Sequence, residues 1–166
     1  SKMPKPLKIR AEDLADLAVI SACLQDAVVS PREISFDPVR RRFAMAVDRF
    51  MWEQTTAGPD SGGKNRVPRG AAAGLFQVEG GLHFDGVLSV KTQNISGAGE
   101  GEYLELLTIH TTPEEQGVAT ITLVFAGGAA IRLEVECIDC YVIDTGRPAE
   151  TRRRPKHPVA RRARRH

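Results

Sequence analysis

The residues best placed for chemistry in this sequence lie in the stretch Leu-His-Phe-Asp, residues 82–85. Side chains alternate between the two faces of a strand, so His83 and Asp85 are expected to share one face. A histidine beside a carboxylate can work as an acid–base pair or contribute ligands to a metal site. His110, in another predicted strand, is a candidate third member. The alternative is a solvated strand face on which His83 and Asp85 are incidental neighbours.

A second motif is Cys-Ile-Asp-Cys at 137–140, which has the spacing of a redox pair or of half a zinc site. A redox pair belongs at the N-terminus of a helix, but this motif falls in a predicted strand. A zinc site needs further ligands, and the remaining cysteine, Cys23, lies in a predicted helix. The favoured interpretation is that Cys137 and Cys140 are small buried core residues, because free cysteine is among the most buried residue types. We therefore expect no metal and no cofactor.

Short sequences that mark common enzymes are missing. The chain has no G-x-S-x-G elbow, no Walker loop, no G-x-G-x-x-G and no H-E-x-x-H. Its glycine pairs fall in predicted loops and hairpin turns and open no predicted helix that could hold a phosphate. The lack of these motifs favours a protein that is not an enzyme, although it does not exclude one.

The strongest charge feature is the basic segment 147–166. It contains nine Arg and Lys residues against one Glu, a net charge of +8, while the other 146 residues carry 14 basic and 20 acidic residues, a net charge of −6. Such a segment can neutralise phosphates and bind nucleic acid without sequence specificity. No aromatic residue is interleaved for base stacking, and its prolines oppose a helix, so a disordered, solubilising tail is the alternative. The candidate nucleic-acid-binding residues are Arg152, Arg153, Arg154, Lys156, Arg161, Arg162, Arg164 and Arg165.

Composition bounds the class of protein. The 166 residues are 42% hydrophobic, enough for one domain with a real core, and only 5% aromatic. No apolar stretch is long enough to cross a membrane, and the first residues lack the apolar region of a signal peptide. The three cysteines of a chain without a secretion signal suggest reduced thiols. We expect a cytoplasmic protein that does not bind a membrane.

The elements that must position these residues begin with an amphipathic helix over residues 12–29, which Ser30-Pro31 ends. Residues 34–52 then alternate with period two and predict a hairpin of one short and one long strand. A change of parity near residues 48 and 49 suggests a bulge in the long strand. Residues 55–74 are rich in Gly, Pro, Ser and Asp and predict a loop, which is a tolerated insertion or a functional lid.

Three further stretches predict strands, at 82–92, 102–111 and 119–144. The last is expected to be a hairpin in which Ala126 pairs with Ala130 around a three-residue loop, with a bulge beyond Cys137. The fold class that follows is α+β. An antiparallel curved sheet or partly closed small barrel of six to seven strands is packed by one N-terminal helix. The predicted domain is 7–146, and 147–166 is a basic tail.

Four ordered blocks carry a family resemblance. They are "DLAVISACLQDAVV", "RRFAMAVDRFMWE", "GLHFDGVLSV" and "LVFAGGAAIRLEVECIDCYVIDTG". Together they resemble a family of short alphaproteobacterial proteins known only as a domain of unknown function, whose members tend to be encoded near histidinol dehydrogenase and a cell-wall enolpyruvyl transferase. The resemblance covers about residues 7–146 and implies a bacterial protein. It implies no activity, cofactor or site residue, and the tail lies outside it.

The leading functional hypothesis is a non-enzymatic binding or adaptor protein that contacts nucleic acid or the ribosome through its basic tail. One alternative is a small enzyme that uses His83, Asp85 and His110 with the loop 55–74 as a lid. Another is a scaffold that forms a homodimer or larger homo-oligomer through an exposed strand edge.

Overall fold

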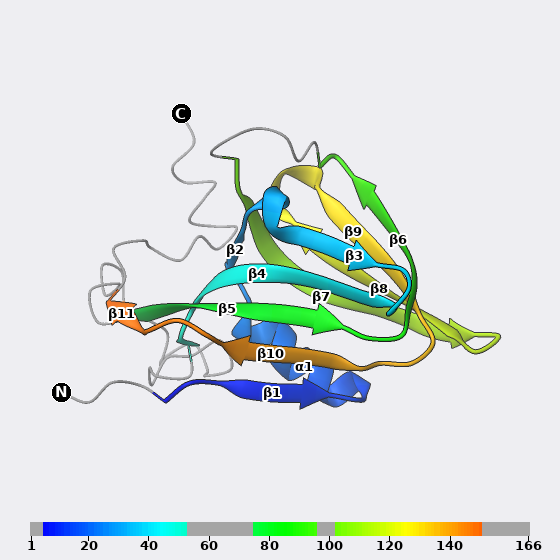
Figure 1. Cartoon of the computed structure of the whole chain (residues 1–166), viewed down its shortest axis with the longest axis horizontal. Helices are drawn as coiled ribbons and strands as arrows, with labels where there is room; N and C mark the ends of the chain where they lie inside the picture. The colour runs from blue at the N-terminus through cyan, green and yellow to red at the C-terminus, as the bar shows by residue number, and fades with distance from the viewer. Residues whose placement is uncertain (1–4, 53–74, 96–101, 151–166) are drawn as a thin grey trace, which may run out of the picture.

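A computed structural model of the protein describes residues 5–52, 75–95 and 102–150 (Figure 1). The predicted loop 55–74 and the candidate basic residues from Arg152 to Arg165 lie outside the described residues. The described elements are, in chain order, β1 (Lys8–Ala11), α1 (Leu14–Cys23), β2 (Val28–Val29), the 3-10 helix η1 (Pro31–Glu33), β3 (Ile34–Asp37), β4 (Arg42–Phe50), β5 (Phe76–Phe84), β6 (Val87–Gln93), β7 (Leu104–Glu115), β8 (Val118–Phe125), the 3-10 helix η5 (Ala126–Gly128), β9 (Ala130–Val135), β10 (Cys140–Asp144) and β11 (Ala149–Glu150).

The strands of the described residues form one antiparallel sheet of eleven strands. Its order is β1-β10-β5-β4-β2-β7-β8-β9-β6, with β3 added beside β4 and β11 beside β5. The two-residue strand β2 links the half that contains β4 and β5 to the half that contains β7 and β8, and the halves lie over one another (Figure 1). The α+β class and the curved antiparallel sheet are confirmed. The strand count of six to seven was too low, and the sheet does not close into a barrel.

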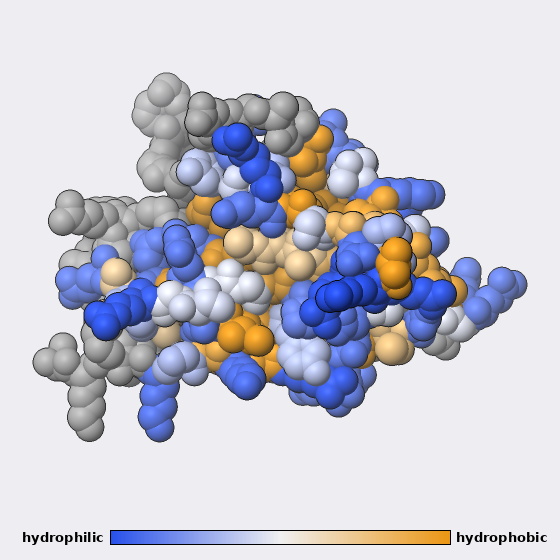
Figure 2. Space-filling view, viewed as in Figure 1, coloured by the Kyte–Doolittle hydropathy of each residue, from blue (hydrophilic) through white to orange (hydrophobic). Residues whose placement is uncertain are grey.

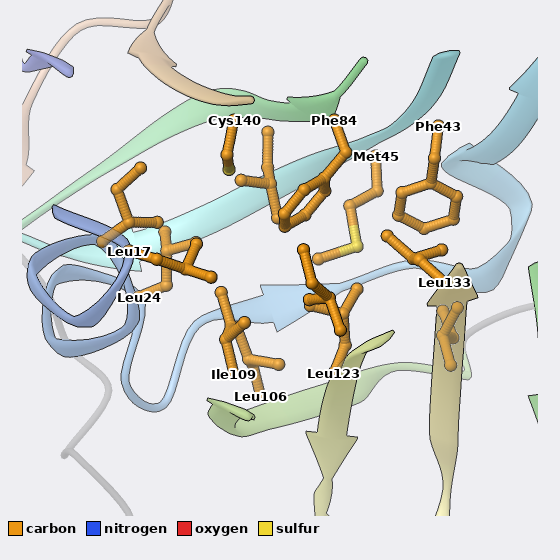
Figure 3. Close-up of a cluster of buried hydrophobic side chains, with 14 of the residues drawn as sticks. Leu17, Leu24, Phe43, Met45, Phe84, Leu106, Ile109, Leu123, Leu133 and Cys140 are labelled. Carbon is orange, nitrogen blue, oxygen red and sulfur yellow. The ribbon is translucent and has the colours of Figure 1, made fainter. Parts of the chain in front are cut away.

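The core fills the space between the two halves. Figure 3 shows Met45, Phe84 and Cys140 from one half facing Leu106 and Leu123 from the other. All five side chains are at most 2% exposed. Burial of this apolar surface is the main force that holds the halves together.

Helix α1 contacts both β1 and β7, so it lies beside both halves. Asp13 caps its N-terminus, with Oδ1 accepting a hydrogen bond from the Asp16 backbone N–H at 2.8 Å. The helix ends at Cys23, so the prediction of a helix over 12–29 was too long. Asp26 has a φ of 66° and its N–H bonds to the Leu106 carbonyl, which turns the chain into β2. Pairing with β4 and β7 therefore overrides the helical pattern in this stretch.

The predicted hairpin of β3 and β4 is confirmed, but the bulge near residue 48 is wrong. Register with β5 is unbroken from Phe43 to Phe50. The parity changes because Arg49 occupies the last core-facing position, while Phe50 packs on the opposite side. There Phe50, Trp52 and Leu75 form a second buried cluster.

Two predicted long strands each divide. Residues 82–92 turn at Gly86, which has a φ of 73°, so β5 and β6 are separate strands. Residues 119–144 form β8, β9 and β10 rather than one hairpin with a bulge, since β10 crosses to pair with β1 and β5. The Phe125 N–H bonds to the Ala129 carbonyl at 2.9 Å and encloses residues 126–128, so the turn has the predicted three residues at a different position. The register is therefore displaced by two residues, and Val124 rather than Ala126 pairs with Ala130.

One ion pair is buried in the core-facing layer. Arg49 Nε and Nη2 donate to Asp144 Oδ1 and Oδ2, each at 2.9 Å, and the side chains are 0% and 1% exposed. Asp144 Oδ2 also accepts from the Leu7 backbone N–H at 2.7 Å. Arg49 and Asp144 belong to the strands on either side of β5, so the pair bridges across it near Gly80, the register partner of Asp144. A Cβ at Gly80 would lie 2.5 Å from the carbonyl oxygen of Ile143.

Candidate functional site

His83 and Asp85 lie together on the outer face of the half formed by β1, β10, β5 and β4. Leu82 and Phe84 are buried in the core, so His83 points outward, as the alternation predicted. Asp85 directly follows β5, and its Oδ2 lies 3.6 Å from His83 Nε2. The structure therefore brings the two residues together, and they are 22% and 27% exposed.

His110 is not part of this group. It lies on β7 opposite Thr122 of β8, and β4 and β2 separate β7 from β5 in the sheet order. A surface pocket of about 260 Å³ lies elsewhere, and neither His83, Asp85 nor His110 lines it. Its lining residues are Pro31, Asn94, Ile95, Glu102, Tyr103 and Leu104.

Strand register aligns three flat polar side chains beside one another. Arg10 of β1 is opposite Tyr141 of β10, which is opposite His83 of β5. The rings of His83 and Tyr141 are stacked, with centroids 4.7 Å apart and an interplanar angle of 25°. The guanidinium of Arg10 lies 5.1 Å from the centroid of the Tyr141 ring. We call Arg10, Tyr141 and His83 the stacked row; this arrangement is favoured by cation–π and aromatic attraction.

Two arginine–aspartate pairs flank the stacked row. Arg42 Nε and Nη2 donate to Asp85 Oδ1 and Oδ2 at 2.7 and 3.3 Å. Arg10 Nε and Nη2 donate to Asp139 Oδ1 and Oδ2 at 3.0 and 3.4 Å. Local turns place the acids: Asp85 precedes Gly86 in the β5–β6 turn, and the Asp85 N–H bonds to the Asp139 carbonyl at 2.9 Å. The four charges therefore compensate one another.

The surroundings keep His83 from becoming a strong base. Burial, followed by the positive charge of Arg42, lowers the pKa of His83, and the carboxylates of Asp85 and Asp139 only partly oppose this. Asp85 in turn is held by two hydrogen bonds from Arg42, so its link to His83 is the longer contact. The hydrogen bond to Asp85 raises the pKa of Arg42, which fixes its positive charge. This arrangement suits a stable polar surface better than proton transfer.

The middle of this face carries small side chains. Ala44 is the register partner of His83, and Ala46 is the partner of Gly81. These residues and Ile143 are half-buried. Figure 2 shows the corresponding pale and orange patch over β4, β5 and β10, with hydrophilic residues around it. The stacked row therefore borders an area where the small side chains of β4 and β5 lie beside Ile143 of β10.

The cysteine motif lies at the start of β10 and in the turn before it, rather than within one strand. Cys140 is buried as predicted, and burial raises the pKa of its thiol above the ordinary value. Cys137 is exposed, so its assignment to the core was wrong. The 137–140 turn brings Asp139 to Asp85 and takes Cys137 out of the core. Among the described residues, no group of three or more His, Cys, Asp or Glu side chains is placed to hold a metal ion.

Sequence reasoning missed Arg10, Arg42, Asp139 and Tyr141. Alternation of Tyr141 with the buried Cys140 and Val142 gave its outward direction, but no local signal shows that β10 lies between β1 and β5. No helix in the described parts of the chain is both long and apolar enough to span a membrane.

The fold and this face define an α+β protein with one curved antiparallel sheet and a charge-balanced outer surface. The chain belongs to the family described as "Protein of unknown function (DUF2948)", whose model matches residues 7–157. The family suggested by the four sequence blocks is thereby confirmed as one of unknown function, and the match extends into the basic segment. Comparison with curated proteins and with solved structures finds no match.

Proposed function

We propose that this protein is a non-enzymatic adaptor of the bacterial cytoplasm that binds nucleic acid, free or within the ribosome, through its basic segment. The observation that supports this most directly is where that segment starts. β11, Ala149–Glu150, pairs with Gln77 and Phe76 at the beginning of β5. Eight basic residues follow between positions 152 and 165 without an acidic one. A folded body thus presents a concentrated positive charge of the kind that binds phosphate backbones.

The candidate acid–base pair supports this choice over the enzyme alternative. A general base needs a free lone pair and a pKa near the working pH. Burial and the positive charge of Arg42 lower the pKa of His83, and Asp85 is committed to Arg42 by two hydrogen bonds. A small enzyme based on His83 and Asp85 remains the second hypothesis, and their 3.6 Å contact is the observation in its favour.

A homo-oligomeric scaffold is the third hypothesis. β1 and β6 end the order of the sheet in the described chain, and exposed strand edges can pair with a second copy. Molecular mass in solution tests it, since a strict monomer at high concentration contradicts a scaffold of this kind.

The proposed function is tested by titrating single-stranded RNA and DNA with the full chain and with a chain that ends at Glu150. This truncation keeps every described strand. A matched full-length variant, with the eight basic residues replaced by Gln, removes charge without changing length. We expect the full chain to bind and both variants to lose most of the affinity.

Salt dependence gives the second readout. For eight phosphate contacts on a single strand, log K against log salt concentration is expected to have a slope of about −6. Between 50 and 200 mM salt the affinity should therefore fall on the order of a thousandfold. Equal binding by the full chain and the Gln variant would show that the basic segment is not the nucleic-acid contact.

A further inference from the structure

On β4, the strand next to His83, the register position that follows the stacked row carries a small side chain. In the register of the sheet, Arg10, Tyr141 and His83 are followed by Ala44. Within residues 5–52, 75–95 and 102–150, Tyr141 is the ring that contacts His83. The second face of the imidazole therefore has no stacking partner in this part of the chain, and beside it lies the methyl group of Ala44.

We propose that this position, beside His83 and above Ala44, binds one base of a single-stranded nucleic acid. We call it the stacking slot. Bases of single strands stack on aromatic side chains, including histidine, in many nucleic-acid-binding proteins. The inference rests on the proposed function and adds to it a contact on the folded body.

The shape of the slot fits a planar ring. Ala44 on β4, the register partner of His83, forms a low floor because its side chain is a single methyl group. His83 forms one wall, held upright by its stacking on Tyr141. A ring placed there extends a stack of flat groups that already exists, and the wall needs no rearrangement.

The charges around the slot favour a neutral ring. Arg42 and Asp85 lie beside His83 and are paired with each other, so the slot offers neither a free cation nor a free anion. Their outer atoms still supply donors and acceptors, since the side chains are 47% and 27% exposed. A nucleobase is planar, uncharged and hydrogen-bonding at its edge, whereas its phosphates would be held by the basic segment.

The two contacts are within reach of one short oligonucleotide. From Gln77, where β11 pairs, to His83 is six residues along β5, or about 20 Å at the rise of a strand. A stacked single strand of about six nucleotides covers this distance. A 12-nucleotide probe is therefore long enough to extend from the slot past β11, after which the basic segment begins.

The test compares two single-stranded 12-nucleotide DNA probes with equal phosphate counts. One has mixed bases, and in the other every base is replaced by an abasic site. We expect the full chain to bind the base-bearing probe about 5- to 150-fold more tightly, the range for stacking of one base.

Two substitutions on β4 then locate the contact. Ala44→Leu fills the slot and should remove the preference for bases while leaving the salt dependence unchanged. Ala46→Leu adds the same bulk on the same face, opposite Gly81 rather than His83, and should keep the preference. His83→Ala, which removes the wall and adds no bulk, should act like Ala44→Leu and covers the case in which the larger side chain disturbs folding.

Each outcome separates this inference from the proposed function. Equal binding of both probes by the full chain overturns the slot and leaves nucleic-acid binding through the basic segment intact. Retention of the base preference in both Ala44→Leu and His83→Ala likewise overturns it, because the base is then bound elsewhere. Failure of the full chain to bind either probe overturns both proposals.

Discussion

The same type of ion pair occurs on both faces of one half of the sheet, in opposite surroundings. Arg49 and Asp144 meet on the core side with side chains 0% and 1% exposed. Arg42 and Asp85 meet on the outer side, 47% and 27% exposed. Both pairs are bidentate, so geometry alone does not distinguish them.

The two pairs differ in whether water can solvate a charge that has lost its partner. A charge left alone in the core has no substitute partner, whereas an exposed one is solvated at once. The inner pair is therefore expected to fix the positions of β4 and β10 across β5. The outer pairs contribute little stability and can rearrange their hydrogen bonds when another molecule arrives.

The largest expected effect comes from breaking the inner pair. Asp144→Leu leaves the Arg49 guanidinium buried without its carboxylate and should lower the free energy of unfolding by about 3 to 5 kcal/mol. Urea denaturation measures this loss. The double variant Arg49→Met with Asp144→Leu should recover much of it, because apolar residues of similar volume remove the unpaired charge. A double variant less stable than the single one would contradict this account.

A smaller loss of stability is expected from adding a side chain at Gly80, which the ion pair of Arg49 and Asp144 crosses. Gly80→Ala puts a Cβ 2.5 Å from the Ile143 carbonyl oxygen and should cost about 1 to 3 kcal/mol through displacement of β10. The neighbouring Gly81→Ala is the control, since its Cβ meets nothing within 4 Å. It should stay within about 0.5 kcal/mol of the parent in thermal or urea unfolding. Equal costs for the two variants would show that the close approach of β5 and β10 is not required.

The smallest expected change in stability is at the outer pair. Arg42→Gln should cost only about 0.2 to 1 kcal/mol. It should, however, move the pKa of His83 upward, because the variant removes a nearby positive charge and frees the Asp85 carboxylate. Titration of the His83 ring by NMR measures the change, and Arg132→Gln on β9, in the other half, is the control.

The sign of the pH effect follows from the lowered pKa of His83. The unfolded chain then takes up a proton at this site more readily than the folded chain, so stability falls as the pH drops through about 6.5. In Arg42→Gln this acid sensitivity should diminish. A downward shift of the His83 pKa in that variant would contradict the assigned role of Arg42.

Local patterns predicted the local part of this structure. Alternation placed His83 and Asp85 on one face and identified the hairpin of β3 and β4, and an amphipathic segment located α1. These features depend on residues close in sequence. The helix was overextended because pairing of β2 with β4 and β7 outweighs the helical pattern after Cys23.

Most of the candidate site depends on distant partners and could not be predicted in this way. Arg10 reaches Tyr141 only because β1 pairs with β10, and Tyr141 reaches His83 only because β10 pairs with β5. The change of parity at Arg49 is real, but its cause is the buried arginine and not the predicted bulge. Local sequence gives no reason to expect an arginine in the core-facing row, because arginine is almost never fully buried unless it is paired.

The pairing of β1 with β10 also has a consequence for how the chain acquires its structure during synthesis. The hydrogen bond from the Leu7 N–H to Asp144 joins residues that are 137 positions apart. At about 5 to 20 residues per second, a ribosome needs roughly 7 to 30 seconds to travel that distance. Until then β1 and the β10-facing edge of β5 have no partners, and non-local pairing of this kind folds slowly. A nascent chain of this protein therefore exposes an unfinished sheet until Asp144 has been synthesised, the period in which it would most need a chaperone.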